Sequence, residues 1–320
     1  MQNRSGSALR LTGLLWLALA CTTPAYELSI GVHQAEPGAS AQIPITLDTA
    51  TNIASVHLQI NYDATILSVG SVTNSAGTIG ALFDMQYTNR DGTVEIVLVN
   101  ETGVGALSGT LVFLAVTVNP GALPGMRTDL ALARGELGAN HGEDLATANL
   151  VTRSDGRLWV VFGSADRDGD GLSDYAEQML DGSPDYRPGR TDTDVTKADT
   201  DGDTMRDGWE VAHSLNPLQD EAAADYDLDG VDNVSEYVAD TDPRDSDSLL
   251  ALTNISVAAG ELYIDWQGGS SAWQYLEFGL HPTSENWTAF FTNQPPTELN
   301  GAATFTATNK AGVFRIKAER

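Results

Sequence analysis

Carboxylates repeat at a fixed spacing in the middle of this chain, and that spacing constrains its folding more than any other feature. Between Asp166 and Asp247 there are 21 Asp and 4 Glu against 6 Lys and Arg, a net charge of −19 over 82 residues. Such a block is usually a solvated, disordered tail, because like charges repel and few apolar residues offset them. Here, however, three separate twelve-residue stretches each carry acids at alternate positions. A disordered tail does not require such regular spacing.

The first stretch begins at Asp166. Its carboxylates stand at positions 1, 3, 5, 9 and 12, and they belong to Asp166, Asp168, Asp170, Asp174 and Glu177. Gly171 at position 6 permits a turn with positive φ, and Leu172 at position 7 offers its backbone carbonyl. This is the pattern of an EF-hand calcium loop, because Ca²⁺ takes six to eight oxygens and alternate side chains of a tight loop converge on one point. Glu177 then closes the ligand shell with two oxygens.

The same positions are filled twice more. The second set is Asp199, Asp201, Asp203, Met205, Asp207 and Glu210, and the third is Asp225, Asp227, Asp229, Val231, Asn233 and Glu236. Thr204 replaces the position-6 glycine in the second loop, so we expect that loop to be strained or to turn differently. The sequence therefore predicts two to three Ca²⁺ ions, and the lower number applies if Thr204 keeps the second loop from binding one.

Each loop leads into a helical apolar pattern. The apolar residues after the first loop are Leu172, Tyr175, Ala176, Met179 and Leu180, which recur with helical spacing. No helical pattern precedes the loops, so each unit is a loop plus one helix. The alternative is that these acids form a solvated face or cap helices. Because the segment from 164 to 247 has few apolar residues, we expect metal binding to be coupled to its folding.

This half-hand arrangement resembles dockerin modules and the thrombospondin type 3-like repeats of bacterial secreted proteins. The stretches that carry the second resemblance are Asp207–His213, Asn216-Pro217, Glu236-Tyr237 and Thr241–Pro243. It differs from a dockerin in having three loops, which start 33 and 26 residues apart, rather than two near-identical segments. The resemblance covers residues 166–247 and implies calcium binding.

Residues 26–163 differ in composition, with β-branched residues in short alternating strands. The clearest strands are 41–47, 56–60, 94–99 and 111–118, separated by turn signals at 36–38, 89–92 and 119–121. Many short strands without helical periodicity indicate a jelly-roll β-sandwich. The stretches Ile60–Asp63, Ile66–Val69, Asp91–Val94 and Gly109–Phe113 resemble cohesin domains. That resemblance implies a non-catalytic module that binds a dockerin-like partner or a polysaccharide, and no single binding residue is assigned.

Residues 248–320 also predict β structure, as a small sandwich of five or six strands. The clearest segments are 262–266, 273–278, 287–291 and 313–316. Trp266, Trp273 and Trp287 would form a sugar-stacking platform in one interpretation, although aromatics at strand spacing more often belong to the core. The expected fold class is therefore mainly β, with a calcium-binding loop–helix segment between two sandwiches.

The first 25 residues have the pattern of an export signal. Arg4 and Arg10 precede the apolar run 11–20, which at ten residues is too short to span a bilayer. Cleavage after Ala25 predicts a secreted or cell-surface chain. Cleavage after Ala20 would instead leave Cys21 for lipidation, which we consider the weaker alternative. No later stretch is apolar enough to cross a membrane.

Charge and motifs exclude several functions. A net charge of −27 repels nucleic acid and anionic membranes. The chain has no GxSxG, HExxH or phosphate-binding glycine loop, and its five His are scattered, so we predict no enzyme activity. The leading hypothesis is a secreted, calcium-binding modular protein for adhesion, scaffolding or carbohydrate recognition in the use of extracellular polysaccharide. The alternatives are a calcium-stiffened spacer, an accessory part of a secreted hydrolase, and self-association through the cohesin-like and dockerin-like elements.

Overall fold

The computed structural model describes residues 26–50, 53–74, 79–104, 107–139, 151–306 and 312–320. The chain divides into two compact units. The first contains the described residues up to His33 together with Ala39–Asn119 and Thr128–Leu158, and the second contains Gln34–Gly38, Pro120–Arg127 and Trp159–Arg320. The predicted export signal, with Cys21, lies outside the described residues. Within them, no helix is long and apolar enough to cross a membrane.

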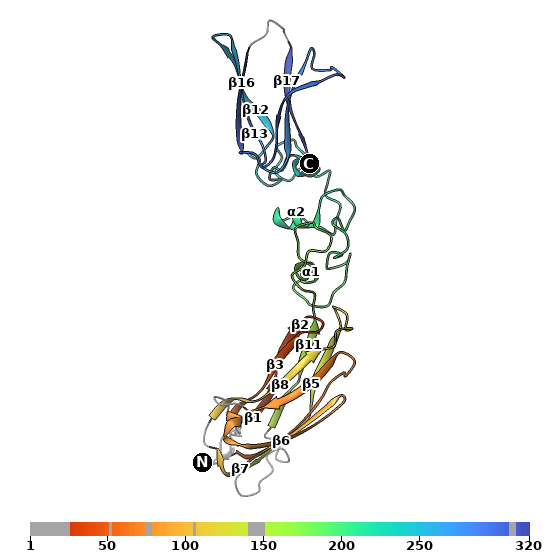
Figure 1. Ribbon diagram of the computed structural model, residues 1–320, viewed down its shortest axis with the longest axis vertical. Helices are drawn as coiled ribbons and strands as arrows, with labels where there is room; N and C mark the ends of the chain where they lie inside the picture. The colour runs from red at the N-terminus through yellow and green to blue at the C-terminus, as the bar shows by residue number, and fades with distance from the viewer. Residues whose placement is uncertain (1–25, 51–52, 75–78, 105–106, 140–150, 307–311) are drawn as a thin grey trace, which may run out of the picture. The chain divides into compact units, whose positions relative to one another are not determined.

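The N-terminal β region is built from two sheets (Figure 1). The first has the order β10-β1-β3-β8-β5 and consists of β10 (Val151–Ser154), β1 (Tyr26–Ile30), β3 (Ser40–Ala50), β8 (Leu107–Val118) and β5 (Leu67–Thr73). The second has the order β2-β11-β9-β4-β7-β6 and consists of β2 (Val32–Ala35), β11 (Gly156–Val160), β9 (Arg127–Ala139), β4 (Ile53–Asn61), β7 (Thr93–Val104) and β6 (Asp84–Arg90). A short 3-10 helix, η1, spans Ile79–Leu82.

Alternation along the strands creates the core of this sandwich. On β7, Val94, Ile96 and Leu98 are fully buried, whereas Val97 and Val99 point outward. The four strands predicted most clearly lie within β3, β4, β7 and β8, so this part of the prediction is confirmed. Burial of each large aliphatic side chain contributes about 1.5–3 kcal/mol, and this sum stabilises the sandwich without any ion.

The middle segment contains three short helices, α1 (Asp174–Gln178), α2 (Asp207–Ala212) and α3 (Asn233–Ala239). Each begins at the ninth position of a predicted loop. Ser173 and Asp232 cap α1 and α3, because their side-chain oxygens accept the backbone N–H of Ala176 and Ser235. The predicted loop-plus-one-helix unit is thus present three times.

The C-terminal β module, defined here as residues 251–319, has two three-stranded sheets. One has the order β12-β13-β16 and the other β15-β14-β17. Their bounds are β12 (Ala251–Ala258), β13 (Glu261–Gln267), β16 (Asn300–Thr306), β15 (Thr288–Asn293), β14 (Trp273–Gly279) and β17 (Val313–Glu319). Ile264, Trp266 and Leu276 form the buried centre between them.

The proposed tryptophan platform in this module is wrong. Trp266 is only 2% exposed and donates its indole N–H to Gln274 Oε1 at 2.8 Å. The guanidinium of Arg315 covers the ring of Trp287 at 4.2 Å. Two of the three rings are therefore engaged inside the protein, as is usual for aromatics at strand spacing.

Candidate metal centres

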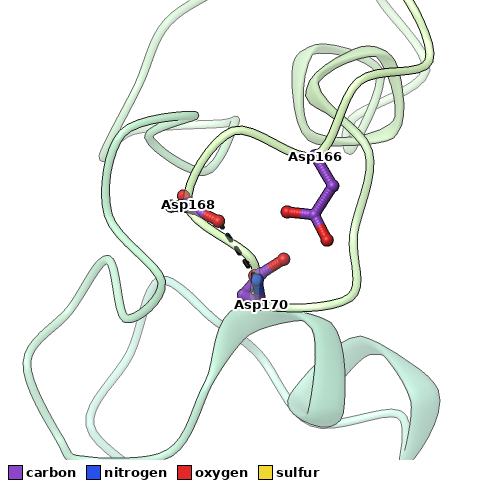
Figure 2. Close-up of side chains that lie close together, drawn as sticks. All are labelled: Asp166, Asp168 and Asp170. Atoms are coloured by element: carbon purple, nitrogen blue, oxygen red, sulfur yellow. Dashed lines mark hydrogen bonds between the residues drawn. The ribbon is translucent and has the colours of Figure 1, made fainter.

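Three aspartates converge at the start of each predicted loop. One carboxylate oxygen from each of Asp166, Asp168 and Asp170 lies within 4.8 Å of the other two, and Figure 2 shows the three side chains close together. The same holds for Asp199, Asp201 and Asp203, and for Asp225, Asp227 and Asp229. The sequence-based expectation that positions 1, 3 and 5 meet is confirmed. Because three carboxylates at this separation repel one another, each cluster favours a cation at its centre.

The aspartate at position 1 also shapes its loop, because its two oxygens accept the backbone N–H groups of positions 4 and 6. In the first loop, Gly169 N and Gly171 N lie 2.7 and 3.1 Å from the Asp166 oxygens. The corresponding distances are 2.7 and 2.9 Å in the second loop and 2.7 and 3.0 Å in the third. All three loops therefore follow one path.

The second loop keeps this path despite Thr204 at position 6. Thr204 has a φ of 82°, close to the 99° of Gly171 and the 96° of Gly230. The alternative that the loop turns differently is wrong, and the expected strain is present, since a β-branched residue is rarely left-handed. Position 4 has the same requirement, which the sequence analysis missed: Leu228 occupies it in the third loop with a φ of 66°. Gly169 and Gly202, which occupy position 4 of the other two loops, could have indicated that this position needs a left-handed backbone.

Buried oxygens without partners provide the test of whether a cation fits. Glu177, Glu210 and Glu236, the glutamates at position 12, are all fully buried. Among the described residues, no hydrogen-bond partner reaches Glu177 Oε2, either oxygen of Glu210, or Glu236 Oε2. The same is true of one oxygen at each position 3, namely Asp168 Oδ2, Asp201 Oδ2 and Asp227 Oδ2. An unsatisfied buried acceptor costs about 1–3 kcal/mol, and more when it is charged, so a hard divalent cation fits this donor set.

The titration of these glutamates reflects the same crowding. Burial, reinforced by the nearby Asp168 carboxylate, raises the pKa of Glu177 to about 8. Burial and Asp203 raise the pKa of Glu210 to about 9, and burial and Asp227 raise that of Glu236 to about 7. Burial also raises the pKa of Asp201 to about 6. A bound cation would favour the ionised form of each group.

The other predicted ligands lie beside the clusters and remain predictions. The side chains at position 9 turn towards the protein backbone. Arg167 N donates to Asp174 Oδ1 at 3.0 Å, and Thr200 N donates to Asp207 Oδ1 at 2.8 Å. Asn233 donates to Glu221 O at 3.0 Å, and its own oxygen is buried and unpartnered among the described residues. At position 7, Leu172, Met205 and Val231 donate their N–H groups to the position-5 aspartates, which leaves their carbonyls as the proposed ligands.

Two threonines support the glutamates, and the sequence analysis missed both. Thr193 Oγ1 donates to Glu177 Oε1 at 3.1 Å, and Thr241 Oγ1 donates to Glu236 Oε1 at 3.3 Å. Both threonines are buried and both are followed by an aspartate, a Thr-Asp pair that was the available signal. Each threonine binds Oε1 of its glutamate, and Oε2 of both glutamates has no hydrogen-bond partner among the described residues.

The packing of the helices differs from their apolar pattern. On α1 the buried residues are Asp174, Glu177 and Gln178, whereas Tyr175 is 38% exposed. The apolar stripe predicted there is therefore not the buried face, because the helix turns its acids inward. The other two helices share a small apolar core of Met205, Trp209, Leu215 and Tyr237. In it the rings of Trp209 and Tyr237 meet edge to face at 5.1 Å.

Successive loops are also hydrogen-bonded to the segments that follow them. Asp170 Oδ2 accepts the backbone N–H of Gly208 in α2 at 2.9 Å, and Arg206 donates to Gly169 O at 2.9 Å. Asp203 Oδ2 accepts the N–H of Glu221, ahead of the third loop, at 3.1 Å. The position-5 aspartates of the first two loops thus connect consecutive parts of the segment.

Comparison with known proteins supports a cohesin domain in the N-terminal β region. Residues 26–152 match the family model of the cohesin domain, and residues 166–179 match that of the bacterial TSP3 repeat. Cellulose-binding protein A of Clostridium cellulovorans is 30% identical over 96 residues, which are 29% of this chain and 5% of that protein. The TSP3 match spans only the first loop and its helix. The dockerin-like resemblance stays a prediction.

Solved cohesin structures are also similar to part of this chain. A non-cellulosomal cohesin from the archaeon Archaeoglobus fulgidus is 18% identical with a TM-score of 0.38, covering 43% of this chain and 92% of that one. The cohesin CaCohA2 from Clostridium acetobutylicum is 21% identical with a TM-score of 0.36, covering 43% of this chain and 91% of that one.

Proposed function

We propose that this chain is a non-catalytic, calcium-binding module for protein recognition, in which the cohesin domain binds a partner and the three loops hold ions that order the adjoining segment. The match of residues 26–152 to the cohesin family supports the recognition role. The buried, unpartnered oxygens at positions 3 and 12 of every loop support the calcium role. We favour a dockerin-like or cell-surface protein over a polysaccharide, because residues 26–152 match the cohesin family and because Trp266 and Trp287 of the C-terminal β module are not free to stack on sugars.

The outward face of the six-stranded sheet is the surface we assign to this partner. Val97 on β7, His57 on β4 and Glu136 on β9 are paired across three adjacent strands. Val97 and Val99 are 38% and 45% exposed. Beside them, His57 Nε2 lies 3.0 Å from Glu95 Oε1, and Arg134 Nε lies 3.0 Å from Glu136 Oε1. Exposed aliphatic side chains surrounded by paired charges form a surface suited to a protein partner.

Binding to a panel of dockerin-bearing proteins, measured by titration calorimetry with the full chain, tests this role. A Val97→Asp variant places a charge at the centre of the proposed surface, so at least a tenfold loss of affinity is expected. Gln42→Asp adds the same charge to the outward face of the other sheet and should bind normally. Equal affinity of both variants would refute the surface, and no binding by any dockerin would refute the partner class.

Direct calcium titration of the chelator-treated chain tests the metal role. Two to three ions should bind, and Glu177→Gln, Glu210→Gln and Glu236→Gln should each lose one. A chain that binds ions but no partner would instead be a structural spacer, and dimerisation on adding Ca²⁺ would favour self-association. Binding of no ion by the wild-type chain would contradict the calcium role.

We also propose export of the chain, on the basis of its leader sequence. The mass of the exported protein should correspond to cleavage after Ala25. A mass that includes a lipid on Cys21 would indicate membrane anchoring instead.

A further inference from the structure

We propose that ion binding at the third loop controls the docking of the C-terminal β module, and that Asp240 is the residue that couples them. This inference rests on the proposed function, because it takes the third loop as a calcium site. An ion bound in the third loop would then affect a part of the protein outside that loop. The coupling would make the position of the C-terminal β module depend on calcium.

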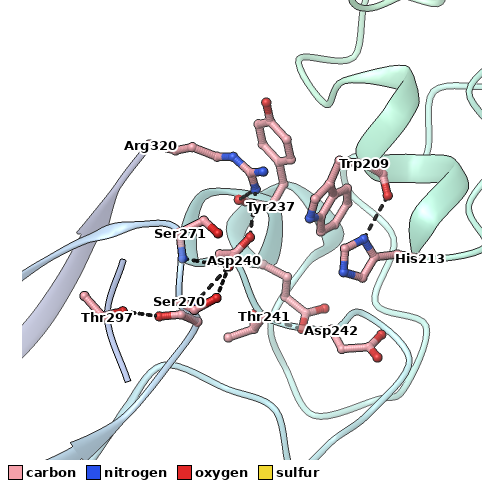
Figure 3. Close-up of polar contacts among 12 residues, drawn as sticks. Trp209, His213, Tyr237, Asp240, Thr241, Asp242, Ser270, Ser271, Thr297 and Arg320 are labelled. Carbon is pink, nitrogen blue, oxygen red and sulfur yellow. Dashed lines mark hydrogen bonds and ion pairs between the residues drawn. The ribbon is translucent and has the colours of Figure 1, made fainter. Parts of the chain in front are cut away.

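Asp240 stands where the last helix meets the C-terminal β module (Figure 3). It follows α3 directly and has a left-handed φ of 57°. Its Oδ2 accepts two consecutive backbone N–H groups, from Ser270 at 3.1 Å and Ser271 at 2.8 Å. Hydrogen bonds to a charged acceptor are stronger than neutral ones, so this carboxylate fixes the loop between β13 and β14 to the end of the helix.

A second contact comes from the end of the chain. Arg320 Nη1 donates to the backbone oxygen of Tyr237 in α3 at 2.6 Å and lies 3.5 Å from Asp240 Oδ1. Its guanidinium covers the Tyr237 ring at 4.2 Å. The residue that follows β17 therefore holds the same helical turn that Asp240 terminates.

The backbones of the two parts are in direct contact at this point. A Cβ added to Gly269 would lie 1.9 Å from the backbone oxygen of Asp240. Nothing larger than glycine fits there, so a small displacement of the helix end would separate the parts or force them to shift. The geometry allows little tolerance in where α3 ends.

Glu236 of the third loop is hydrogen-bonded to the chain just beyond the end of α3. Glu236, at position 12, belongs to α3 and is four residues before Asp240. Its Oε1 accepts the Thr241 hydroxyl at 3.3 Å, and its backbone oxygen accepts the Thr241 N–H at 3.0 Å. The glutamate and the two residues after the helix thus form one hydrogen-bonded unit.

This unit needs an ion to be ordered. A helix of seven residues is too short to be stable by itself, and the buried Glu236 carboxylate keeps Oε2 without a hydrogen-bond partner among the described residues. A cation held by Glu236 and the aspartates of the third loop would supply that partner. Loss of the ion is therefore expected to disorder α3 and, with it, the contacts of Asp240.

The first loop provides a matched control. Glu177 occupies the same position 12 and is held by Thr193 rather than by the segment that contacts the C-terminal β module. Replacing Glu177 should empty the first site and leave the Asp240 contacts in place. The two variants Glu236→Gln and Glu177→Gln thus make the same chemical change with different expected consequences.

Hydrogen exchange of the full chain, followed by mass spectrometry, tests the coupling. In wild-type protein, the peptide containing the Ser270 and Ser271 amides should exchange at least tenfold faster in chelator than with saturating Ca²⁺. Glu236→Gln should exchange fast even with Ca²⁺, whereas Glu177→Gln should remain protected. The Gly171 and Gly230 amides, which bond to Asp166 and Asp225, report the order of the loops themselves.

The outcomes separate this inference from the proposed function. If the loop amides respond to Ca²⁺ but the Ser270 peptide does not, the coupling is refuted while calcium binding stands. If no amide responds, the calcium role itself is refuted. Equal exchange of the Ser270 peptide in the two glutamine variants would also refute the coupling.

Reciprocity supplies an independent test, because coupling between sites acts equally in both directions. Asp240→Ala and Arg320→Gln should each weaken Ca²⁺ at the third loop about fivefold or more and leave the first loop unchanged. Asp242→Ala removes a nearby charge without touching Ser270 or Ser271, so it should cause a smaller loss. An equal effect of Asp240→Ala and Asp242→Ala would show that only local charge matters, and would overturn the inference.

Discussion

The N-terminal sandwich and the acidic segment from 164 to 247 have opposite interiors. The sandwich buries aliphatic side chains such as Leu58, Ile96 and Leu98, whereas the acidic segment buries Glu177, Glu210 and Glu236. Hydrophobic burial stabilises the first whatever ions are present, while buried carboxylates destabilise the second unless a counter-charge is supplied. Neighbouring regions of one chain therefore depend on different solution variables, so each can be perturbed separately.

Calcium removal should have the largest effect and should separate the two regions most clearly. At Ca²⁺ concentrations 100-fold above Kd, each site contributes about 2.7 kcal/mol, so three sites would contribute about 8 kcal/mol. Calorimetry with and without chelator should show one transition that shifts strongly and a sandwich transition that does not. Equal shifts of both transitions would contradict the contrast between the regions.

Truncation of a side chain in the sandwich core should lower the stability of the sandwich and leave calcium binding by the acidic segment unchanged. Leu58 is fully buried, and Leu58→Ala should destabilise the sandwich by about 3–5 kcal/mol because it leaves a cavity. Denaturant unfolding followed at the sandwich transition measures this loss. Calcium titration of the same variant is the control, and a changed stoichiometry would mean that the regions are not independent.

Acidity should stabilise the metal-free acidic segment. The folded-state pKa values of Glu177 and Glu210 are raised to about 8 and about 9, above the ordinary 4.5 of the unfolded chain. The folded state therefore binds more protons, so its stability is greatest below pH 4.5 and falls as pH rises through 8 to 9.

Thermal unfolding in chelator at pH 5 and pH 8 measures this effect, and the acidic segment should be the more stable at pH 5. With saturating Ca²⁺ the sign should reverse, since protons compete with the ion for the same carboxylates. The same sign with and without Ca²⁺ would mean that the glutamates are not ligands.

The smallest effect concerns the strained turn in the second loop. Thr204→Gly should stabilise the calcium-loaded protein by about 1 kcal/mol, because glycine adopts the left-handed φ without steric cost. The converse change in the first loop, Gly171→Thr, should destabilise by a similar amount. Chemical denaturation with Ca²⁺ present compares the two, and a loss of stability in Thr204→Gly would show that the threonine is not strained.

The elements of this fold were accessible from sequence where a repeating pattern dictates geometry. Alternation placed β3, β4, β7 and β8, and the spacing of Asp166, Asp168 and Asp170 correctly predicted that their carboxylates meet. Both follow from local rules, because strand and loop side chains point in fixed directions relative to their own backbone.

Other features could not be predicted from local patterns, because they depend on what lies across the chain or on comparison between the loops. The apolar stripe of α1 gave no sign that Gln178 would be one of its buried residues. Strand spacing favoured a core position for Trp266 but could not identify Gln274, from the next strand, as the acceptor of its indole N–H. The left-handed Leu228 has no local propensity for that conformation, so only comparison with Gly169 and Gly202 could have indicated it.

The position-5 aspartates have a consequence for engineering this array. Asp170 and Asp203 each use one oxygen on a backbone amide of the following segment, whereas Asp229 Oδ2, in the last loop, has no such donor among the described residues. Excising the middle unit would remove Gly208, the donor to Asp170. The middle unit therefore cannot be deleted without disturbing the first loop. Extension meets a different obstacle, because Asp229 Oδ2 is buried and would have to be uncovered before an added unit could donate an amide to it.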